Sequence, residues 1–166
     1  MSLLKLCAWL QATPVGVLVR ESLWVFPTLV AIHILGLAAS VGLVVWFDLR
    51  LLDAHMRESS AARVYGQIMP WALGGFVVMW VSGALLVSGF ATAAYGNVYF
   101  RVKVAALALA GLNALLYHCV TARRMAQQHG RVSKPPSARL AGLISIVLWV
   151  VVIMAGRMLS YTLYSH

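Results

Sequence analysis

The sequence predicts an all-α integral membrane protein, a bundle of four transmembrane helices with a short interfacial helix at its N-terminus. Two features of the composition point to this class: 62% of the 166 residues are hydrophobic and only 10% are charged. Soluble domains carry about a quarter charged residues, so this composition is typical of a membrane protein. The third observation is that the chain holds four apolar runs, and a membrane-spanning helix needs about 20 such residues.

The four runs cover most of the chain, and we expect residues 1–166 to form a single transmembrane domain. The predicted spans are about 24–47, 69–91, 100–121 and 140–162. Pro135 and Pro136 prevent helix continuation in the loop before the last span. Ahead of the first span, Thr13 and Pro14 have the pattern of an N-cap followed by proline in the first turn. This pattern predicts a short helix lying on the outer membrane surface.

The basic residues lie in the gaps between the apolar runs. The net charge is +9, from 13 Lys and Arg against four Asp and Glu. Because of this placement we attribute the charge to membrane topology and lipid headgroups, and we expect no nucleic-acid partner. Four spans put both termini on one side. The 48–66 and 122–139 loops carry eight basic residues against five elsewhere, which favours these loops in the cytoplasm and both termini outside.

Two histidines fall inside the predicted spans. His33 shares a helix face with Gly36 and Ser40, and His118 continues a stripe of alanines that recurs every fourth residue (Ala106, Ala110, Ala114). Small residues mark helix contacts in membranes, and intramembrane ionisable side chains are candidate functional sites. The alternative is that each neutral imidazole only hydrogen-bonds a neighbouring helix. Asn113 and Ser82 are further candidates for bonds between helices, and Asn113 also for cofactor binding.

The depth of each histidine restricts what the two can bind together. At 1.5 Å per residue, His33 lies roughly 14 Å and His118 roughly 27 Å below the outer edge of its span. The mismatch of about 13 Å disfavours one haem held between them. Met154 on the fourth span is level with His33, as are Met79 and Ser82 on the second. His/Met ligation suits haem iron, although methionines in a bundle also serve ordinary packing.

Basic side chains lie just outside the level of His33. Arg101, Lys103 and Arg157 can pair with haem propionates there, or extend to lipid headgroups instead. Glu21 is the acid on that side that can pair with one of them.

A second polar group falls at the cytoplasmic edge, where Asp48, Arg50 and His55 follow the first apolar run. We expect Asp48 either to orient His118 or to form an ion pair with Arg50 or Arg63.

Three segments resemble a family of small, four-helix bacterial inner-membrane proteins of unassigned function. They are "FPTLVAIHILGLAASVGLVVWFDLRLLD" (26–53), "MPWALGGFVVMWVSGALL" (69–86) and "NVYFRVKVAALALAGLNALLYH" (97–118). The resemblance implies the bacterial inner membrane, so both termini would be periplasmic. More distantly, the architecture is similar to b-type cytochromes and cytochrome b membrane anchors. The chain departs from their bis-histidine pattern because its two intramembrane histidines are not level.

The leading hypothesis is electron transfer by a haem b protein, a small cytochrome or the membrane subunit of a redox complex. His33 would be the axial ligand, and His118 would serve a second haem or a quinone pocket. The partners would be quinone, a periplasmic redox protein and other membrane subunits. The alternatives are copper or other transition-metal handling, for which thioether and imidazole ligands are suited, and a non-catalytic structural or assembly subunit. No soluble-enzyme motif is found in the sequence, and we expect no independent enzyme activity.

Overall fold

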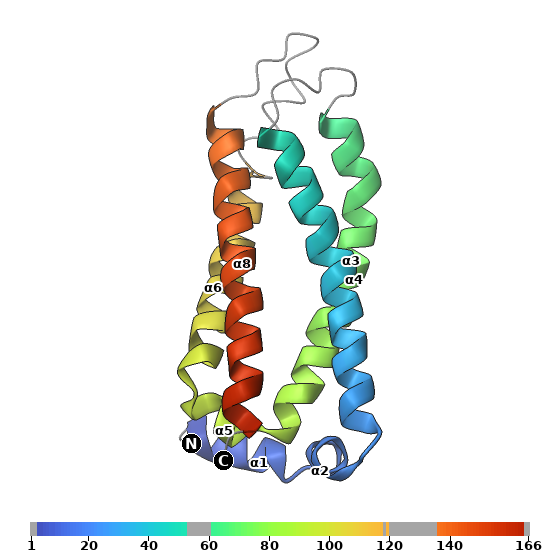
Figure 1. The fold of residues 1–166 in the computed structure, drawn as a ribbon, viewed down its shortest axis with the longest axis vertical. Helices are drawn as coiled ribbons and strands as arrows, with labels where there is room; N and C mark the ends of the chain where they lie inside the picture. The colour runs from blue at the N-terminus through green and yellow to red at the C-terminus, as the bar shows by residue number, and fades with distance from the viewer. Residues whose placement is uncertain (1–2, 53–60, 118, 120–135, 165–166) are drawn as a thin grey trace.

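The computed structural model describes residues 3–52, 61–117, 119 and 136–164 (Figure 1). Every element in these ranges is helical, which confirms the all-α class. The helices are α1 (Leu3–Gln11), α2 (Pro14–Glu21), α3 (Val25–Leu52), α4 (Ala61–Gly89), α5 (Ala91–Gly96), α6 (Val98–Leu116) and α8 (Pro136–Tyr164).

Four of the helices are long and apolar enough to cross a membrane. Their candidate spans are Val25–Leu49, Gly66–Gly89, Val98–Leu116 and Arg139–Thr162. These are the four predicted spans, with ends that shift by a few residues. Helix α6 ends at Leu116 with Tyr117 as its C-cap, and residues 118, 120 and 121 of the third predicted span lie outside the described residues. The fourth helix begins at Pro136, where proline is tolerated because the first helical turn needs no N–H donor.

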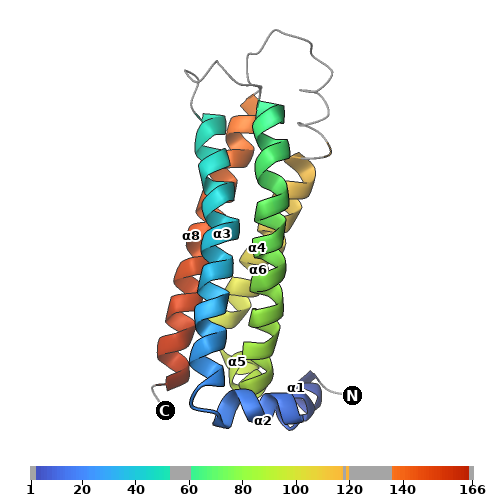
Figure 2. The same ribbon diagram turned by 90° about the vertical axis from the view of Figure 1, so that its right-hand side faces the viewer.

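The long helices form two antiparallel pairs. In Figures 1 and 2, α3 runs along α4 and α6 runs along α8, and the two pairs meet mainly through α3 and α8. Buried apolar side chains from all four helices form the shared core; its members are Val41, Met79, Ala106, Ala110, Trp149 and Val152. The aromatic rings of Phe76 and Trp149, with centroids 5.5 Å apart, also connect α4 to α8 across this core.

Small residues bring α3 and α4 into close contact. A Cβ on Gly75 would lie 2.7 Å from the backbone nitrogen of Ser40 and 3.0 Å from the carbonyl oxygen of Gly36. Gly36 and Ser40 are buried, so the predicted face of the first span does pack on a neighbouring helix. On α6, Ala106 and Ala110 of the alanine stripe are buried, whereas Ala114 is exposed.

Short helices close one end of the bundle. Figure 2 shows α1 and α2 lying across that end, and the two are bent by 66° relative to each other. The predicted N-terminal helix is α2, and its cap is as expected: the Thr13 hydroxyl accepts a hydrogen bond from the Gly16 N–H at 3.2 Å. The helices α1 and α5 were not predicted. Both the start of α1 and the end of α8 lie at this end, as four spans require (Figure 1).

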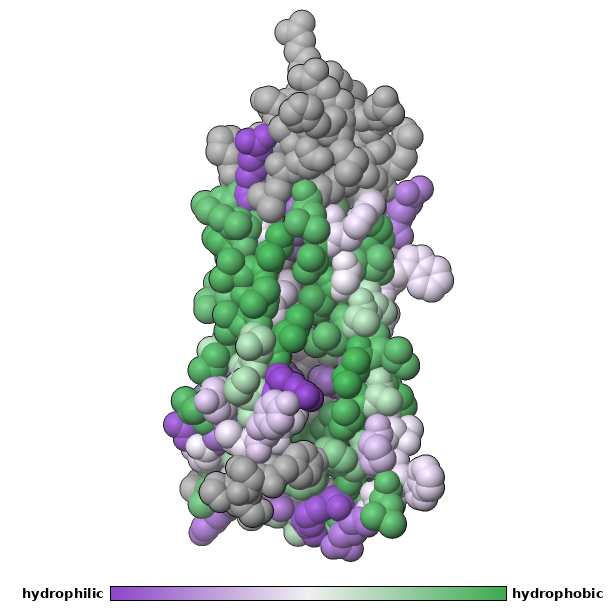
Figure 3. All heavy atoms as spheres, in the orientation of Figure 1, coloured by the Kyte–Doolittle hydropathy of each residue, from purple (hydrophilic) through white to green (hydrophobic). Residues whose placement is uncertain are grey.

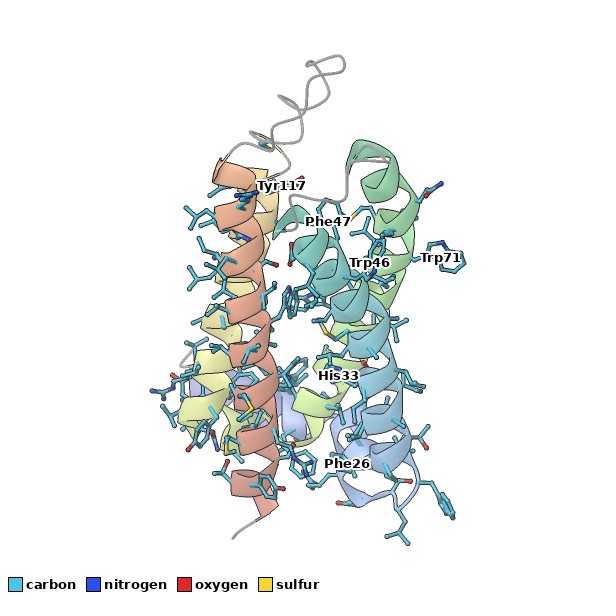
Figure 4. All side chains as sticks on the ribbon, turned by 45° about the horizontal axis from the view of Figure 1, so that its top comes forward. Phe26, His33, Trp46, Phe47, Trp71 and Tyr117 are labelled. Atoms are coloured by element: carbon cyan, nitrogen blue, oxygen red, sulfur yellow. The ribbon has the colours of Figure 1, made fainter. Side chains whose placement is uncertain are left out.

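The outer surface of the bundle is strongly apolar. Large hydrophobic side chains such as Trp71 (76% exposed) and Leu35 (70% exposed) point outward, and Figure 4 shows Trp71 directed away from the helices. In Figure 3 the visible face of the bundle is mostly hydrophobic, with hydrophilic residues gathered mainly in its lower part. Such a surface is stable against lipid and not against water. The chain is therefore a multi-pass membrane protein.

Candidate functional site

His33 lies on α3 in the half of the bundle next to α1 and α2 (Figure 4). Its Nδ1 is 3.0 Å from the hydroxyl oxygen of Ser82 on α4. The Ser82 hydroxyl has one hydrogen, which it donates to the carbonyl of Val78 at 2.6 Å. With that hydrogen directed to Val78, Ser82 accepts from His33 in the tautomer that carries the ring hydrogen on Nδ1. In that tautomer the other ring nitrogen, Nε2, keeps its lone pair and can bind a ligand.

A glycine makes room for the imidazole on α4. A Cβ on Gly83 would lie 3.1 Å from Cε1 of His33, closer than almost all such contacts. The ring therefore rests on the backbone of α4 at Ser82 and Gly83. Since the hydrogen bond and this contact act together, they fix the ring's orientation.

The second pair of helices brings a cation to the same level. Lys103 projects from α6 and is half-buried. A Cβ on Gly156 of α8 would lie 3.3 Å from its Nζ atom, so the amine rests against α8. Lys103 is also close enough to His33 for a coulombic interaction. Each long helix thus contributes one or two residues to the site: His33 from α3, Ser82 and Gly83 from α4, Lys103 from α6 and Gly156 from α8.

The two arginines predicted beside Lys103 lie elsewhere. Arg101 is exposed; its Nε donates to the carbonyl of Tyr95 at 3.3 Å, and its guanidinium lies 5.7 Å from the Tyr95 ring centroid. Arg157 is also exposed, 4.8 Å from the ring centroid of Tyr161, and donates to its hydroxyl at 3.0 Å. Both guanidiniums therefore occupy the surface of the bundle. Of the three basic candidates, only Lys103 faces the interior.

The other candidates around His33 have different positions. Met154 is 53% exposed, on the outer face of α8, and Met79 is buried in the core one turn from Ser82. Asn113 joins helices as expected, because its Nδ2 donates to the carbonyl of Ala141 on α8 at 2.9 Å. The expectation that Glu21 pairs with one of the site's basic groups is wrong. Glu21 forms its ion pair with the adjacent Arg20, at 3.2 Å, because the two are neighbours on an exposed helix end.

At the opposite end of the bundle, Asp48 is buried, with 5% of its surface exposed. It interacts through a side-chain hydrogen bond with Ser145 of α8. Its Oδ2 has no hydrogen-bond partner among the residues that the structure describes. Arg50 belongs to α3, but its side chain is outside the description, as is that of Arg63 on α4. His55 and His118 also lie outside the described residues.

Within the described ranges, no three His, Cys, Asp or Glu residues come together as a metal-binding group. The sequence indicated His33, Ser82 and Lys103 as separate candidates. The structure joins His33 to Ser82 by a hydrogen bond and brings the charge of Lys103 within coulombic range of His33. Gly156 and Ser145 were not singled out. Glycine or serine at a single position of an apolar helix gives no signal about which side chain will lie opposite it.

These features define a class: a multi-pass α-helical membrane protein with a polar site between two helix pairs. Residues 7–162 match the model of a family of unknown function (DUF6644), so the chain belongs to that family. The match agrees with the resemblance to a family of unassigned function. No curated protein and no solved structure matches the chain.

Proposed function

We propose that this protein is a membrane electron-transfer protein that binds haem b with His33 as an axial ligand, as a small cytochrome or as the membrane subunit of a redox complex. The observation that carries the proposal is the hydrogen bond of His33 Nδ1 to Ser82. A metal-bound histidine almost always donates its second ring nitrogen to an acceptor, which fixes the tautomer and the ring orientation. In the tautomer with its hydrogen on Nδ1, Ser82 would fill that role and Nε2 would bind iron.

Haem bound at this position supplies a one-electron redox centre. The residues of the chain provide an oriented imidazole, an apolar environment and a cation at the same level. His118 is the candidate ligand for a second haem or a quinone pocket. Because basic residues favour the 48–66 and 122–139 loops in the cytoplasm, we place the His33 site in the periplasmic half of a bacterial inner membrane. Its partners would be quinone, a periplasmic redox protein and other membrane subunits.

The test is the absorption spectrum of the purified protein after expression with excess haem, recorded oxidised and reduced. We expect Soret and α bands of haem b in the wild type. His33→Ala should lose this haem. His118→Ala keeps His33 and should therefore retain the spectrum of at least one haem. A colourless wild type contradicts the proposal, as does a spectrum that His33→Ala leaves unchanged. Metal analysis of the same samples tests the copper alternative through its stoichiometry.

A second candidate, a non-catalytic assembly subunit, is favoured by the same hydrogen bond. The bond joins α3 to α4, and a neutral histidine can serve this purpose alone. The two candidates differ in a simple observation. A colourless protein whose His33→Ala variant is destabilised would support the structural role.

A further inference from the structure

Lys103 is a charged group inside the bundle. Its amine reaches α8 at Gly156, and its charge acts on His33 from the opposite helix pair. A lysine in the membrane-spanning part of a protein is costly unless it pairs with an opposite charge or reaches water or a headgroup. A counter-charge close to Nζ would therefore stabilise the folded protein.

The described part of the chain provides no such counter-charge near Lys103. The sequence has four acidic residues. Glu21 is paired with Arg20, and Asp48 lies 15 residues from His33 on α3, which corresponds to about 22 Å. Asp53 and Glu58 come after the end of α3 and lie outside the described residues. The titratable group that the structure places in coulombic contact with Lys103 is thus an imidazole and not a carboxylate.

The interior of the bundle is less completely buried around His33 and Lys103 than in the hydrophobic core. Above Lys103, toward Ala106 and Ala110, the interior is filled by the buried cluster around Trp149 and Val152. At the level of the site, His33, Lys103 and Gly156 all remain partly exposed. Figure 3 shows hydrophilic atoms beside a hollow in the lower half of the apolar face, between the two helix pairs. This hollow lies on the side of the bundle that faces the lipid.

From this arrangement we propose that Lys103 binds the carboxylate of an amphiphilic ligand whose apolar body lies between the helix pairs. The ammonium supplies up to three donors and a full charge, and an ammonium–carboxylate bond is stronger than one between neutral groups. The carboxylate can come from a haem propionate or from a fatty acid. Only the first source rests on the proposed function.

The experiment uses the full chain in nanodiscs of phosphatidylcholine, with empty nanodiscs as the background. Haem is compared with its dimethyl ester by absorbance, and cis-parinaric acid with its methyl ester by energy transfer from tryptophan. Each ester keeps the apolar body and removes the charge. The variants are Lys103→Met and Lys103→Arg, with Arg101→Met and Arg157→Met as matched controls, because those two arginines are held on tyrosine rings at the surface.

We expect the wild type to bind at least one acid more tightly than its ester, by roughly 10- to 100-fold. Lys103→Met should remove this preference, Lys103→Arg should keep most of it, and the two controls should leave it unchanged. A preference that survives in Lys103→Met, or that disappears in either control, overturns the proposal. So does equal binding of acid and ester by the wild type for both ligands.

The two ligands separate this inference from the proposed function. Lys103-dependent binding of parinaric acid without haem binding supports the carboxylate site and overturns the haem proposal. The opposite outcome is His33-dependent haem binding with no difference between haem and its ester and no preference for parinaric acid. It would support the haem proposal and overturn the carboxylate site.

Discussion

Nδ1 of His33 and Oγ of Ser82 lie 3.0 Å apart, and the hydrogen bond between them links α3 to α4 within the membrane-spanning part of the bundle. The same serine donates to the carbonyl of Val78 on its own helix. Ser82 thereby transmits the position of the α4 backbone to the imidazole ring. The bond has consequences both for stability and for the ligand-binding ability of His33.

Replacing Ser82 by alanine should destabilise the protein by about 1 kcal/mol, since interhelical hydrogen bonds in membranes contribute about 0.6 to 2 kcal/mol. If His33 binds haem, the same change should weaken haem binding by about 10-fold or more, because the ring loses its second partner. Unfolding in mixed micelles and haem titration measure the two effects.

Ser88→Ala is the matched control for Ser82→Ala. Ser88 is also buried on α4, but its hydroxyl donates to the carbonyl of Leu85 on the same helix. Ser88→Ala should lower the free energy of unfolding by less than Ser82→Ala does, and it should leave haem binding unchanged. Equal effects of the two substitutions would mean that the bond to His33 contributes nothing.

Gly75→Ala should destabilise the pairing of α3 with α4 by about 1 to 3 kcal/mol, the usual cost of overpacking. The added methyl group would lie 2.7 Å from the backbone nitrogen of Ser40 on the facing helix, and backbone cannot rotate away. The neighbouring Gly74 has no atom within 4 Å of the corresponding position. Gly74→Ala should therefore be neutral or stabilising through helix propensity. Unfolding of both variants tests this, and similar losses would contradict the close approach of α3 and α4.

Lys103→Met should increase the stability of the protein without ligand by about 1 to 3 kcal/mol, because it replaces a half-buried charge with an apolar side chain of similar length. Arg101→Met should change stability by less than about 1 kcal/mol, since the guanidinium is exposed. Unfolding in detergent, with ligand removed, measures both. A loss of stability in Lys103→Met would show that the ammonium already has a favourable partner within the chain.

The end of the bundle that carries α1 and the C-terminal end of α8 should face the periplasm. The reason is that the 48–66 and 122–139 loops, which join the long helices on the other side, carry the larger number of basic residues. Alkaline phosphatase fused to the C-terminus should be active in bacterial cells, and green fluorescent protein fused at the same point should be dark. The opposite result would place the His33 site in the cytoplasmic half.

The fold was largely predictable because each span is a local property. A helix in lipid must satisfy its backbone hydrogen bonds within itself, so about 20 consecutive apolar residues suffice to predict it. The cap formed by Thr13 and Pro14 is equally local, and α2 begins where it was expected. The short helix α1, which lies across one end of the bundle, was not predicted. Its apolar sequence is too short to span a membrane, and its position depends on contacts with distant segments, such as the bond from the Thr92 hydroxyl to Gln11 at 2.6 Å.

The candidate site was predictable only in part. His33 stood out because a polar ring is rare in an apolar helix, and its small-residue face did prove to be the face toward α4. The sequence treated Arg101, Lys103 and Arg157 as equivalent, since all three lie near the same span edge. Only the rotation of α6 and α8 separates them. It directs Lys103 inward and leaves Arg157 against Tyr161 at the surface.

The sequence by itself determined the membrane environment, the number of long helices and the shared side of the two termini, because these depend on apolar content and segment length along one chain. The tertiary structure decided which polar groups meet. His33, Ser82 and Lys103 come from three helices, and Gly83 and Gly156 allow the ring and the amine to approach α4 and α8. Such a meeting depends on how whole helices rotate and approach one another. That geometry is set by packing across the bundle, and no single segment encodes it.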